Sequence, residues 1–527
     1  MYKSFLISLI LTVVPLTTFS QGNALKSISV NDIKRQMKYL SSDSLQGRKT
    51  GSDGNLKAAE FIANEASLLG LKPVPGQKSM YQQLPFQKIT VRPDSTFIVA
   101  MDTTGRVTAQ GNITPFMVPS SDVSVTGDIV FAGYGYINSK QNYNDLHGIQ
   151  INNKILIVMT RKPDLAGSGM PGADEEVSED TELRKLSSLL IMNPKAVLFV
   201  ADPGYGKPVE SSFTSAESYK LVPLFKTRGW DFQINVGIIS EATADAILAQ
   251  TGQNLASLQK KIAETKAPVS FIIPGVKGKV KIGVEKDTVE SPNIVAYMEG
   301  SDSVLKKECV IYSAHYDHVG VDAAGDVFNG ANDNASGSTG LLSVAKAFSS
   351  LHDKPLRSIV FLWTTGEEEG LYGSNYYTAN PLFPLDKTVA DINFDMIGRS
   401  RMAADTGKVR GEKLDITGPD SIRLVSARDC REFINIATNA GKENKLVVID
   451  EGKGLHFTGS DHYPFTVKGI PAVFFFTGLH RDYHKETDDY RFIDFNKMLK
   501  VAQTGFLTGF RIANRPERIA FDAPNSK

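Results

Sequence analysis

Hydrophobic residues repeat with a helical period near the start of the chain. Met37, Leu40 and Ile62 belong to apolar stripes at the spacing of one helix face, which is typical of amphipathic helices. Polar residues and glycines between Ser41 and Gly54 interrupt the stripes, and such a cluster marks a loop. The sequence therefore predicts two helices joined by a loop between residues 30 and 70.

The pattern changes to short apolar runs near residue 90. Asp128–Phe131 and Ile155–Met159 are examples, and turn-rich stretches separate the runs, as expected for strands. The spacing of apolar residues over Leu183–Leu190 suggests a helix. We therefore expect a β-rich insert over residues 91–275.

After about residue 275 the chain alternates between apolar strands and helices. The strands are predicted at Cys309–Ser313, Ile359–Trp363, Ile392–Phe394, Leu446–Ile449 and Ala472–Phe476. Apolar runs of this kind are buried on both sides, as in a sheet with helices on both faces. The predicted fold class is α/β, with a mixed sheet flanked by helices plus the β-rich insert.

Composition narrows the classes of partner and of metal site. With 527 residues, 58 basic against 58 acidic side chains and zero formal net charge, the chain has no electrostatic footprint for nucleic acid or an anionic membrane. The only cysteines, Cys309 and Cys430, are too few for a cysteine-based zinc cluster. We interpret them as separate buried thiols, Cys309 on an apolar strand and Cys430 in a helix, with a disulfide as the alternative. A metal site must then use histidines and carboxylates.

The N-terminus resembles an export signal. Lys3 precedes the apolar stretch Phe5–Leu16, and the small residues Thr18 and Ser20 precede a predicted cleavage after Ser20. An uncleaved anchor is the alternative, but the apolar stretch is shorter than the roughly 20 residues that span a bilayer. We expect a periplasmic or extracellular protein without stable membrane insertion after cleavage.

Histidines and carboxylates gather where the predicted strands end. His315 ends one strand, Glu368 and Asp395 follow two others, and Asp333 and His484 lie in loops. Each position alone also fits an ordinary loop, an Asx turn or a solvated acidic turn. Together they supply two imidazoles and three carboxylates near strand ends, where α/β sheets bind ligands. This set suits two zinc ions that share one aspartate.

The motifs resemble those of the M28 family of zinc aminopeptidases, both in their residues and in their order along the chain. They are His-Tyr-Asp-His at 315–318, Asn-Asp-Asn at 332–334, Glu-Glu-Glu-Gly-Leu-Tyr-Gly-Ser at 367–374, Asp-Met-Ile-Gly at 395–398, Gly-Ser-Asp-His at 459–462 and Tyr-His at 483–484. The early segment from Leu45-Gln46-Gly47-Arg48 to Pro73 looks like the N-terminal helices of that family. Residues 127–160 resemble the protease-associated domain that many members carry as an insert.

The resemblance implies a domain organisation. It comprises a signal peptide at 1–20, an N-terminal helical part of the peptidase domain at 21–90, the protease-associated insert at 91–275, the catalytic domain at 276–515 and a C-terminal tail at 516–527.

The resemblance also implies roles for individual residues. His315 and Asp395 would bind one zinc, Glu368 and His484 the other, and Asp333 both. Glu367 would be the general base, Asp317 would support the site from behind His315, and the Tyr483 hydroxyl would stabilise the oxyanion. A cis peptide bond is expected after Asp333. We assign His318, His462, His480 and Asp461 to support or structure rather than to ligation.

The predicted function is therefore a metalloaminopeptidase that removes N-terminal residues from peptides with two zinc ions per chain. Within the same fold, a glutaminyl cyclase, which uses one zinc, and a glutamate-type carboxypeptidase or dipeptidase stay open as alternatives. A non-catalytic binding protein is the alternative from another class. The complete ligand set and Glu367 argue against a degenerate site.

Overall fold

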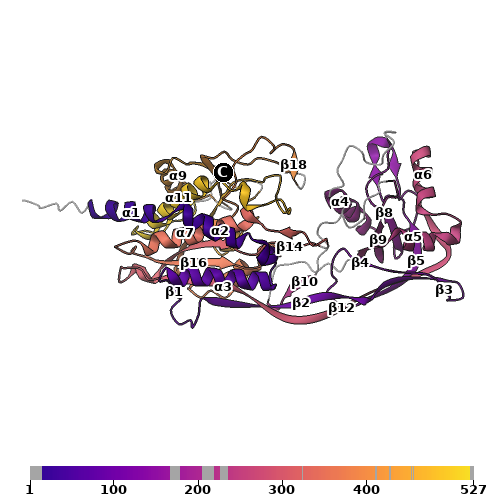
Figure 1. Cartoon of the computed structure of the whole chain (residues 1–527), viewed down its shortest axis with the longest axis horizontal. Helices are drawn as coiled ribbons and strands as arrows, with labels where there is room; N and C mark the ends of the chain where they lie inside the picture. The colour runs from indigo at the N-terminus through magenta and orange to yellow at the C-terminus, as the bar shows by residue number, and fades with distance from the viewer. Residues whose placement is uncertain are drawn as a thin grey trace, which may run out of the picture. The chain divides into compact units, whose positions relative to one another are not determined.

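The described residues form two compact units (Figure 1). This computed structural model describes residues 15–165, 179–204, 219–225, 235–322, 324–409, 412–426, 429–452, 454 and 456–522. The first unit contains the chain up to Leu84, Glu290–Gly320 and the chain from Val327 onward, and the second contains Pro85–Val289 and Val321–Asp326. The predicted insert, 91–275, lies within the second unit.

A mixed sheet forms the centre of the first unit. Its strands follow the order β21 (Val447–Gly452), β20 (Ser421–Ser426), β22 (Ala472–Phe476), β17 (Thr388–Phe394), β13 (Cys309–His315), β16 (Ser358–Thr364) and β12 (Phe271–Met298). The four strands β22, β17, β13 and β16 run parallel to one another. Antiparallel pairing begins at β12 on one side and at β20 on the other. The predicted mixed sheet is confirmed.

Helices cover this sheet on both faces because its central strands are apolar on both. In β13, Val310 and Tyr312 belong to one buried cluster, whereas Cys309 and Ile311 belong to another, following the alternation of side chains along a strand. The first cluster includes residues of α1 (Pro15–Ser27), α2 (Val30–Leu40), α3 (Asp53–Leu68), α7 (Gly337–Ser349), α9 (Arg431–Glu443) and α11 (Phe495–Ala513). The second includes residues of α8 (Tyr372–Ala379) and α10 (His462–Val467).

Local sequence explains the two early helices and their loop. The side chains of Ser29 and Ser52 accept hydrogen bonds from the first turns of α2 and α3, and serine is a preferred N-cap residue. A 3₁₀ segment, Asp43–Arg48, lies between the helices. Two helices and a loop, as the hydrophobic pattern predicts, are present.

The second unit combines parallel strands, long antiparallel strands and helices. Its sheet follows the order β12, β5 (Val123–Phe131), β8 (Ile155–Met159), β9 (Ala196–Val200), β11 (Val236–Ile238) and β4 (Thr114–Pro115). Beside this path, β2 (Tyr81–Asp102) pairs antiparallel with β3 (Val107–Asn112) and β10 (Tyr219–Pro223). Its helices include α4 (Glu179–Leu190), α5 (Glu241–Leu248) and α6 (Leu255–Thr265). The likeness of this unit to a protease-associated domain stays a prediction.

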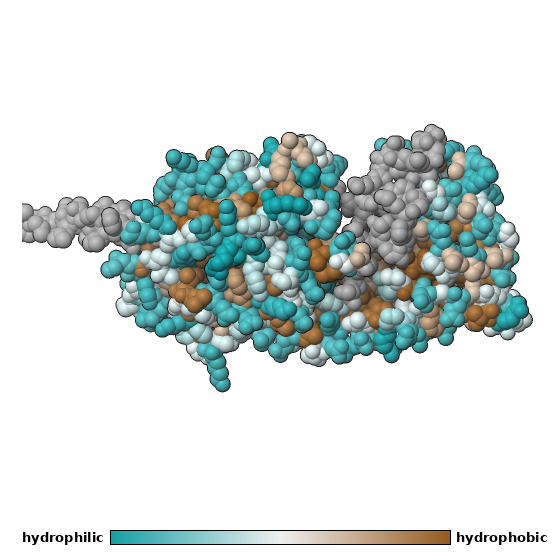
Figure 2. Space-filling model, viewed as in Figure 1, coloured by the Kyte–Doolittle hydropathy of each residue, from teal (hydrophilic) through white to brown (hydrophobic). Residues whose placement is uncertain are grey.

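Short two-residue strands complete the described strands. They are β1 (Lys72–Pro73), β6 (Ile137–Asn138), β7 (Tyr143–Asn144), β14 (Gly320–Val321), β15 (Val327–Phe328), β18 (Lys408–Val409) and β19 (Glu412–Lys413). Most of the surface visible in Figure 2 is hydrophilic, with hydrophobic residues in scattered patches. The large apolar side chains are concentrated in the buried clusters instead.

Residues 1–14 of the predicted signal peptide lie outside the described residues, and the predicted cleavage after Ser20 falls inside α1. Among the described helices, none has the length and apolar character needed to cross a bilayer. Cys309 and Cys430 are buried and not bonded to each other, which confirms two separate thiols. Cys430 precedes α9 as its N-cap residue instead of lying within the helix.

The aromatic side chain before the Asp395 loop supports the sheet. Phe394 is fully buried and stacks on Phe475 and Tyr312, with ring centroids 5.5 and 6.3 Å apart. We expect Phe394→Ala to lower the free energy of unfolding by about 3–5 kcal/mol through lost burial and a cavity. Denaturant titration in a Trp230→Phe background measures this change, because the fluorescence then comes from the buried Trp363 alone.

The control for this substitution is Val447→Ala, at a side chain that is 62% exposed. Exposed substitutions usually change stability by less than about 0.5 kcal/mol. Equal effects of the two substitutions would contradict the role of Phe394 in the core.

Candidate metal centre

Five strand ends and loops bring the predicted ligands together. His315 is the last residue of β13, Glu367 and Glu368 follow β16, and Asp395 follows β17. Asp333 lies in the turn that leads into α7, and His484 lies in the loop after β22. Because β13, β16, β17 and β22 are parallel, their carboxyl ends meet at one edge of the sheet.

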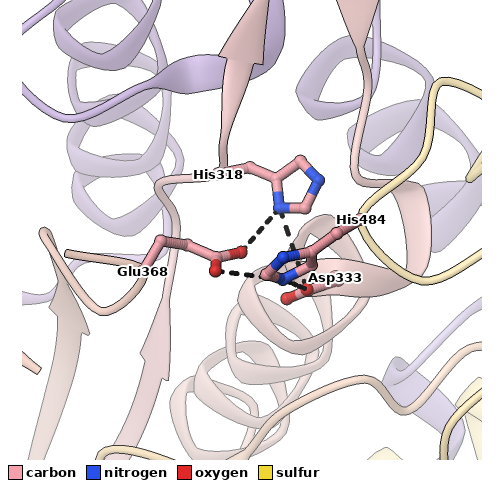
Figure 3. Close-up of side chains that lie close together, drawn as sticks. All are labelled: His318, Asp333, Glu368 and His484. Atoms are coloured by element: carbon pink, nitrogen blue, oxygen red, sulfur yellow. Dashed lines mark hydrogen bonds and ion pairs between the residues drawn. The ribbon is translucent and has the colours of Figure 1, made fainter. Parts of the chain in front are cut away.

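Two groups of donor atoms share Asp333. In the first group, His315 Nε2 lies 3.4 Å from Asp333 Oδ1 and 3.3 Å from Asp395 Oδ1. In the second group, His484 Nε2 lies 3.0 Å from Asp333 Oδ2 and 3.0 Å from Glu368 Oε2. Figure 3 shows the second group, which also contains His318. The structure therefore brings all five predicted ligands to one place.

Backbone contacts hold the Asp333 loop in position. Asp488 Oδ2 accepts hydrogen bonds from the amides of Asn332 and Asp333 at 2.9 and 3.0 Å. The Asn334 side chain accepts from Met396 N at 3.1 Å and donates to Phe394 O at 3.0 Å, so it ties the loop to the Asp395 segment. The peptide bond between Asp333 and Asn334 is cis, as expected.

Asp317 contacts the His315 ring and the backbone of Glu367 and Glu368. Its backbone oxygen is 3.3 Å from His315 Nδ1, so His315 turns its other nitrogen toward the carboxylates. The Asp317 carboxylate accepts hydrogen bonds from the amides of Glu367 and Glu368 at 3.2 and 3.4 Å, and from Thr50 Oγ1 at 3.0 Å. Burial raises the pKa of Asp317 to about 7.

Buried carboxylates dominate the electrostatics of the site. Burial raises the pKa of Glu367 well above its usual range, and the neighbouring carboxylate of Glu368 adds to the rise. Burial opposes protonation of His484, but the carboxylates of Glu368 and Asp333 outweigh it and raise the pKa to about 9. A cation between these groups would relieve the repulsion, since buried charges need partners.

The donor set fits zinc. His484 Nε2 is buried and has no hydrogen-bond partner among the described residues, although carboxylate oxygens lie on two sides of it. A ring nitrogen so placed can bind a cation in place of its proton. Imidazole nitrogens and carboxylate oxygens are common zinc ligands in proteins, and Asp333 has one oxygen for each group.

A small cavity of about 60 Å³ opens beside the two groups. Asp333, Glu367 and Asp395 line one side. The rest of its wall is mostly apolar and contains Met396, His456, Gly459, Phe474, Phe476, Leu479 and Tyr483. The Tyr483 ring stacks on that of His484, with centroids 3.9 Å apart.

The other histidines of the motifs occupy different places. His462 Nε2 lies 3.1 Å from Phe457 O, and burial lowers the pKa of His462 to about 4. His480 is fully buried, 4.0 Å from Asp488 Oδ1. Asp461 accepts hydrogen bonds from Thr364 and Ser374. These three residues lie outside both donor groups, whereas His318 lies inside the second.

Sequence reasoning missed the residues that hold the loops. Arg48 is buried and donates to the backbone oxygens of Tyr316, Asn329 and Gly330 at 2.8, 2.7 and 3.1 Å. It thus ties the His315 segment to the loop before Asp333. The Leu-Gln-Gly-Arg stretch was a signal for this residue, but nothing in the sequence distinguishes Asp488 from an ordinary loop aspartate.

Comparison with known proteins finds a family match that lies mainly in the first unit. Residues 293–507 match Peptidase family M28. Leucine aminopeptidase 2 of Trichophyton equinum is 31% identical over 231 residues, which are 44% of this chain and 40% of that protein. A probable zinc metalloprotease of Pyricularia oryzae is 26% identical over 276 residues, 44% of this chain and 51% of that protein. The chain thus spans about half or less of the length of these relatives.

Solved structures extend the likeness in fold to nearly the whole chain. An aminopeptidase from Aneurinibacillus sp. strain AM-1 matches with a TM-score of 0.53 and 19% identity, covering 96% of this chain and 98% of that one. A zinc aminopeptidase from Bacillus subtilis matches with a TM-score of 0.54 and 16% identity, covering 93% and 96%. The resemblance read from the motifs is confirmed: residues 293–507 match peptidase family M28.

Proposed function

We propose that the protein is a zinc-dependent aminopeptidase that hydrolyses the N-terminal peptide bond of peptides. The observation that carries the proposal is the pair of donor groups that share Asp333, with Glu367 on the wall of the adjoining cavity. The printed names of the relatives, leucine aminopeptidase and zinc metalloprotease, support the same reaction class.

The ligand assignment follows the two groups. His315 and Asp395 would hold one zinc, Glu368 and His484 would hold the other, and Asp333 would serve both. When bound, the zinc ions would supply Lewis acidity at the scissile carbonyl and for the attacking water.

Glu367 is placed to move protons. Its Oε2 lies 3.9 Å from His315 Nε2, and its side chain is 11% exposed, at the cavity wall. As general base it takes a proton from the attacking water, and as general acid it returns the proton to the leaving amine. Asp317 fixes the backbone at Glu367, and the Tyr483 hydroxyl donates to the oxygen of the attacked carbonyl.

The cavity favours a free amine next to an apolar side chain. Three carboxylates line it, and no lysine or arginine is among its described lining residues. With Asp333 and Asp395 assigned to metal, Glu367 is the lining carboxylate left to attract a cationic N-terminus, whereas a carboxypeptidase needs a cationic side chain for the substrate carboxylate. The apolar walls of Met396, Phe474 and Phe476 favour an apolar N-terminal residue.

Two donor groups also weigh against the single-zinc glutaminyl cyclase, and the retained Glu367 weighs against a non-catalytic binding protein. The predicted signal peptide places the reaction in the periplasm or outside the cell. The second unit, with its resemblance to a protease-associated domain, is proposed as an insert in the peptidase.

The first prediction concerns Glu367. Glu367→Gln keeps the shape of the side chain but removes its basicity, so kcat should fall at least 100-fold, within the range of about 10²–10⁴ that general bases contribute. Zinc content measured by atomic emission should stay at the wild-type value. Unchanged turnover would remove Glu367 from the role of base.

The second prediction concerns the shared ligand. Asp333→Ala should reduce the bound zinc from two ions per chain to fewer than one, because it removes a donor from both groups. The matched control is Glu369→Gln, since Glu369 pairs with Lys49 at 3.2 Å outside both groups. Loss of a single zinc in Asp333→Ala would contradict the bridge.

The third prediction concerns substrates. Leucyl and phenylalanyl nitroanilides should be hydrolysed faster than glutamyl or lysyl nitroanilides, and N-acetylation should abolish turnover. A chelator should stop the reaction and added zinc should restore it. Release of a C-terminal residue or cyclisation of N-terminal glutamine, without hydrolysis of the nitroanilides, would favour the alternative enzymes.

A further inference from the structure

His318 contacts the second donor group from a side that none of the five proposed ligands occupies. Its Nδ1 lies 2.8 Å from Glu368 Oε1 and 3.8 Å from Asp333 Oδ2 (Figure 3). The Glu368 oxygen nearest His484 is the other one, Oε2, at 3.0 Å. Each oxygen of the Glu368 carboxylate thus faces one imidazole. Only Oε2 is assigned to the proposed metal position.

The direction of the hydrogen bond follows from chemistry. In the proposed site Glu368 binds a metal ion, and a glutamate does so as the ionised carboxylate. An ionised carboxylate only accepts hydrogen bonds, so His318 must donate through Nδ1–H. Its Nε2 then carries the lone pair.

The surroundings of His318 Nε2 indicate whether Nδ1 donates a hydrogen bond or binds a metal ion. His318 Nε2 is buried and has no partner among the described residues. A histidine that binds metal through Nδ1 would leave Nε2–H unpaired there, yet metal-bound histidines almost always donate their second N–H. His315 meets this condition, because its Nδ1 faces the backbone oxygen of Asp317 at 3.3 Å. His318 does not meet it.

The fold holds the His318 ring in place on several sides. A Cβ atom added to Gly330 would lie 2.4 Å from His318 Cδ2, so only glycine leaves room for the ring. The His484 ring meets it edge to face, with centroids 5.4 Å apart. The His318 amide donates to Arg48 O at 3.3 Å. A side chain so confined presents Nδ1 to Glu368 in one orientation.

We propose that His318 is a positioning residue, which donates from Nδ1 to Glu368 Oε1 and so holds Oε2 toward the metal shared with His484. The inference rests on the proposed two-zinc function and goes beyond it, because it gives the carboxylate ligand of the second metal position a support like the one that Ser460 gives Asp395, whose Oδ2 accepts from Ser460 Oγ at 2.7 Å. Loss of the hydrogen bond leaves Glu368 free to rotate and weakens that position alone.

Substitution of His318 by asparagine or glutamine tests which of its two ring nitrogens is needed. In His318→Asn the side-chain NH₂ can occupy the place of Nδ1, whereas in His318→Gln it lies near the place of Nε2. His318→Ala removes both. The readout is the zinc affinity of each step, measured by titrating metal-free protein against a chromophoric chelator, together with the visible spectrum of the Co²⁺-loaded protein.

We expect His318→Ala and His318→Gln to weaken the zinc affinity of one of the two binding steps by about 10–100-fold, as is typical of residues that support a metal ligand. His318→Asn should recover affinity to within about threefold of wild type, on the scale of a retained hydrogen bond, with an unchanged Co²⁺ spectrum. The control His352→Asn, at an exposed histidine, should change neither step.

Other outcomes overturn the inference. If His318→Asn loses as much affinity as His318→Ala and the Co²⁺ spectrum changes, His318 is a direct ligand. If all three variants lower only the melting temperature and keep both affinities, the role is structural. If wild-type protein itself binds no zinc, the proposed function fails first, so the two failures are distinguishable.

Discussion

The Asp333 carboxylate is the element on which the site depends, because both donor groups include it. An aspartate can serve two cations only if its backbone is fixed and its two oxygens face opposite ways. The Asp488 carboxylate binds the amides that lead into Asp333, and the Asn334 side chain ties the same turn to the strand end before Asp395. Arg48 joins the preceding loop to the segment that carries His315. Much of the surrounding polar network thus serves to hold one side chain.

Negative charge explains why the site needs cations. Asp317, Asp333, Glu367, Glu368 and Asp395 lie within one buried region together with a few imidazoles. Burial, with the neighbouring carboxylate of Glu368, raises the pKa of Asp317 to about 7, and the pKa of Glu367 rises well above its usual range. Without cations, such a cluster must hold protons on some of its carboxyl groups. Bound zinc would replace those protons and leave Glu367 ionised, as a general base requires.

The sequence predicted much of the fold and of the donor set, for identifiable reasons. The strands Ile155–Met159 and Ala472–Phe476 have the predicted bounds, because each is a continuous apolar run between polar segments. The M28 likeness of the motifs is confirmed, and the structure brings the five proposed ligands together.

The sequence could not predict the supports, because their roles arise from tertiary contacts. Arg48 acts on backbone oxygens far along the chain, and Asp488 resembles any aspartate in a polar loop. The place of His318 depends on which of its nitrogens faces Glu368. Cys430 ends a loop where a helix was expected, and helix boundaries are among the least reliable features of sequence reasoning.

The residues of the proposed chemistry and those of the proposed substrate contacts differ in how the structure holds them. The proposed ligands and Glu367 lie at strand ends and in turns that backbone hydrogen bonds hold, so their positions tolerate little change. The apolar cavity wall comes mainly from Phe474, Phe476, Leu479 and Met396, none of which belongs to the donor groups. A substitution in that wall changes the volume offered to a substrate without moving a ligand. Substrate preference can therefore vary in this fold while the two donor groups stay the same.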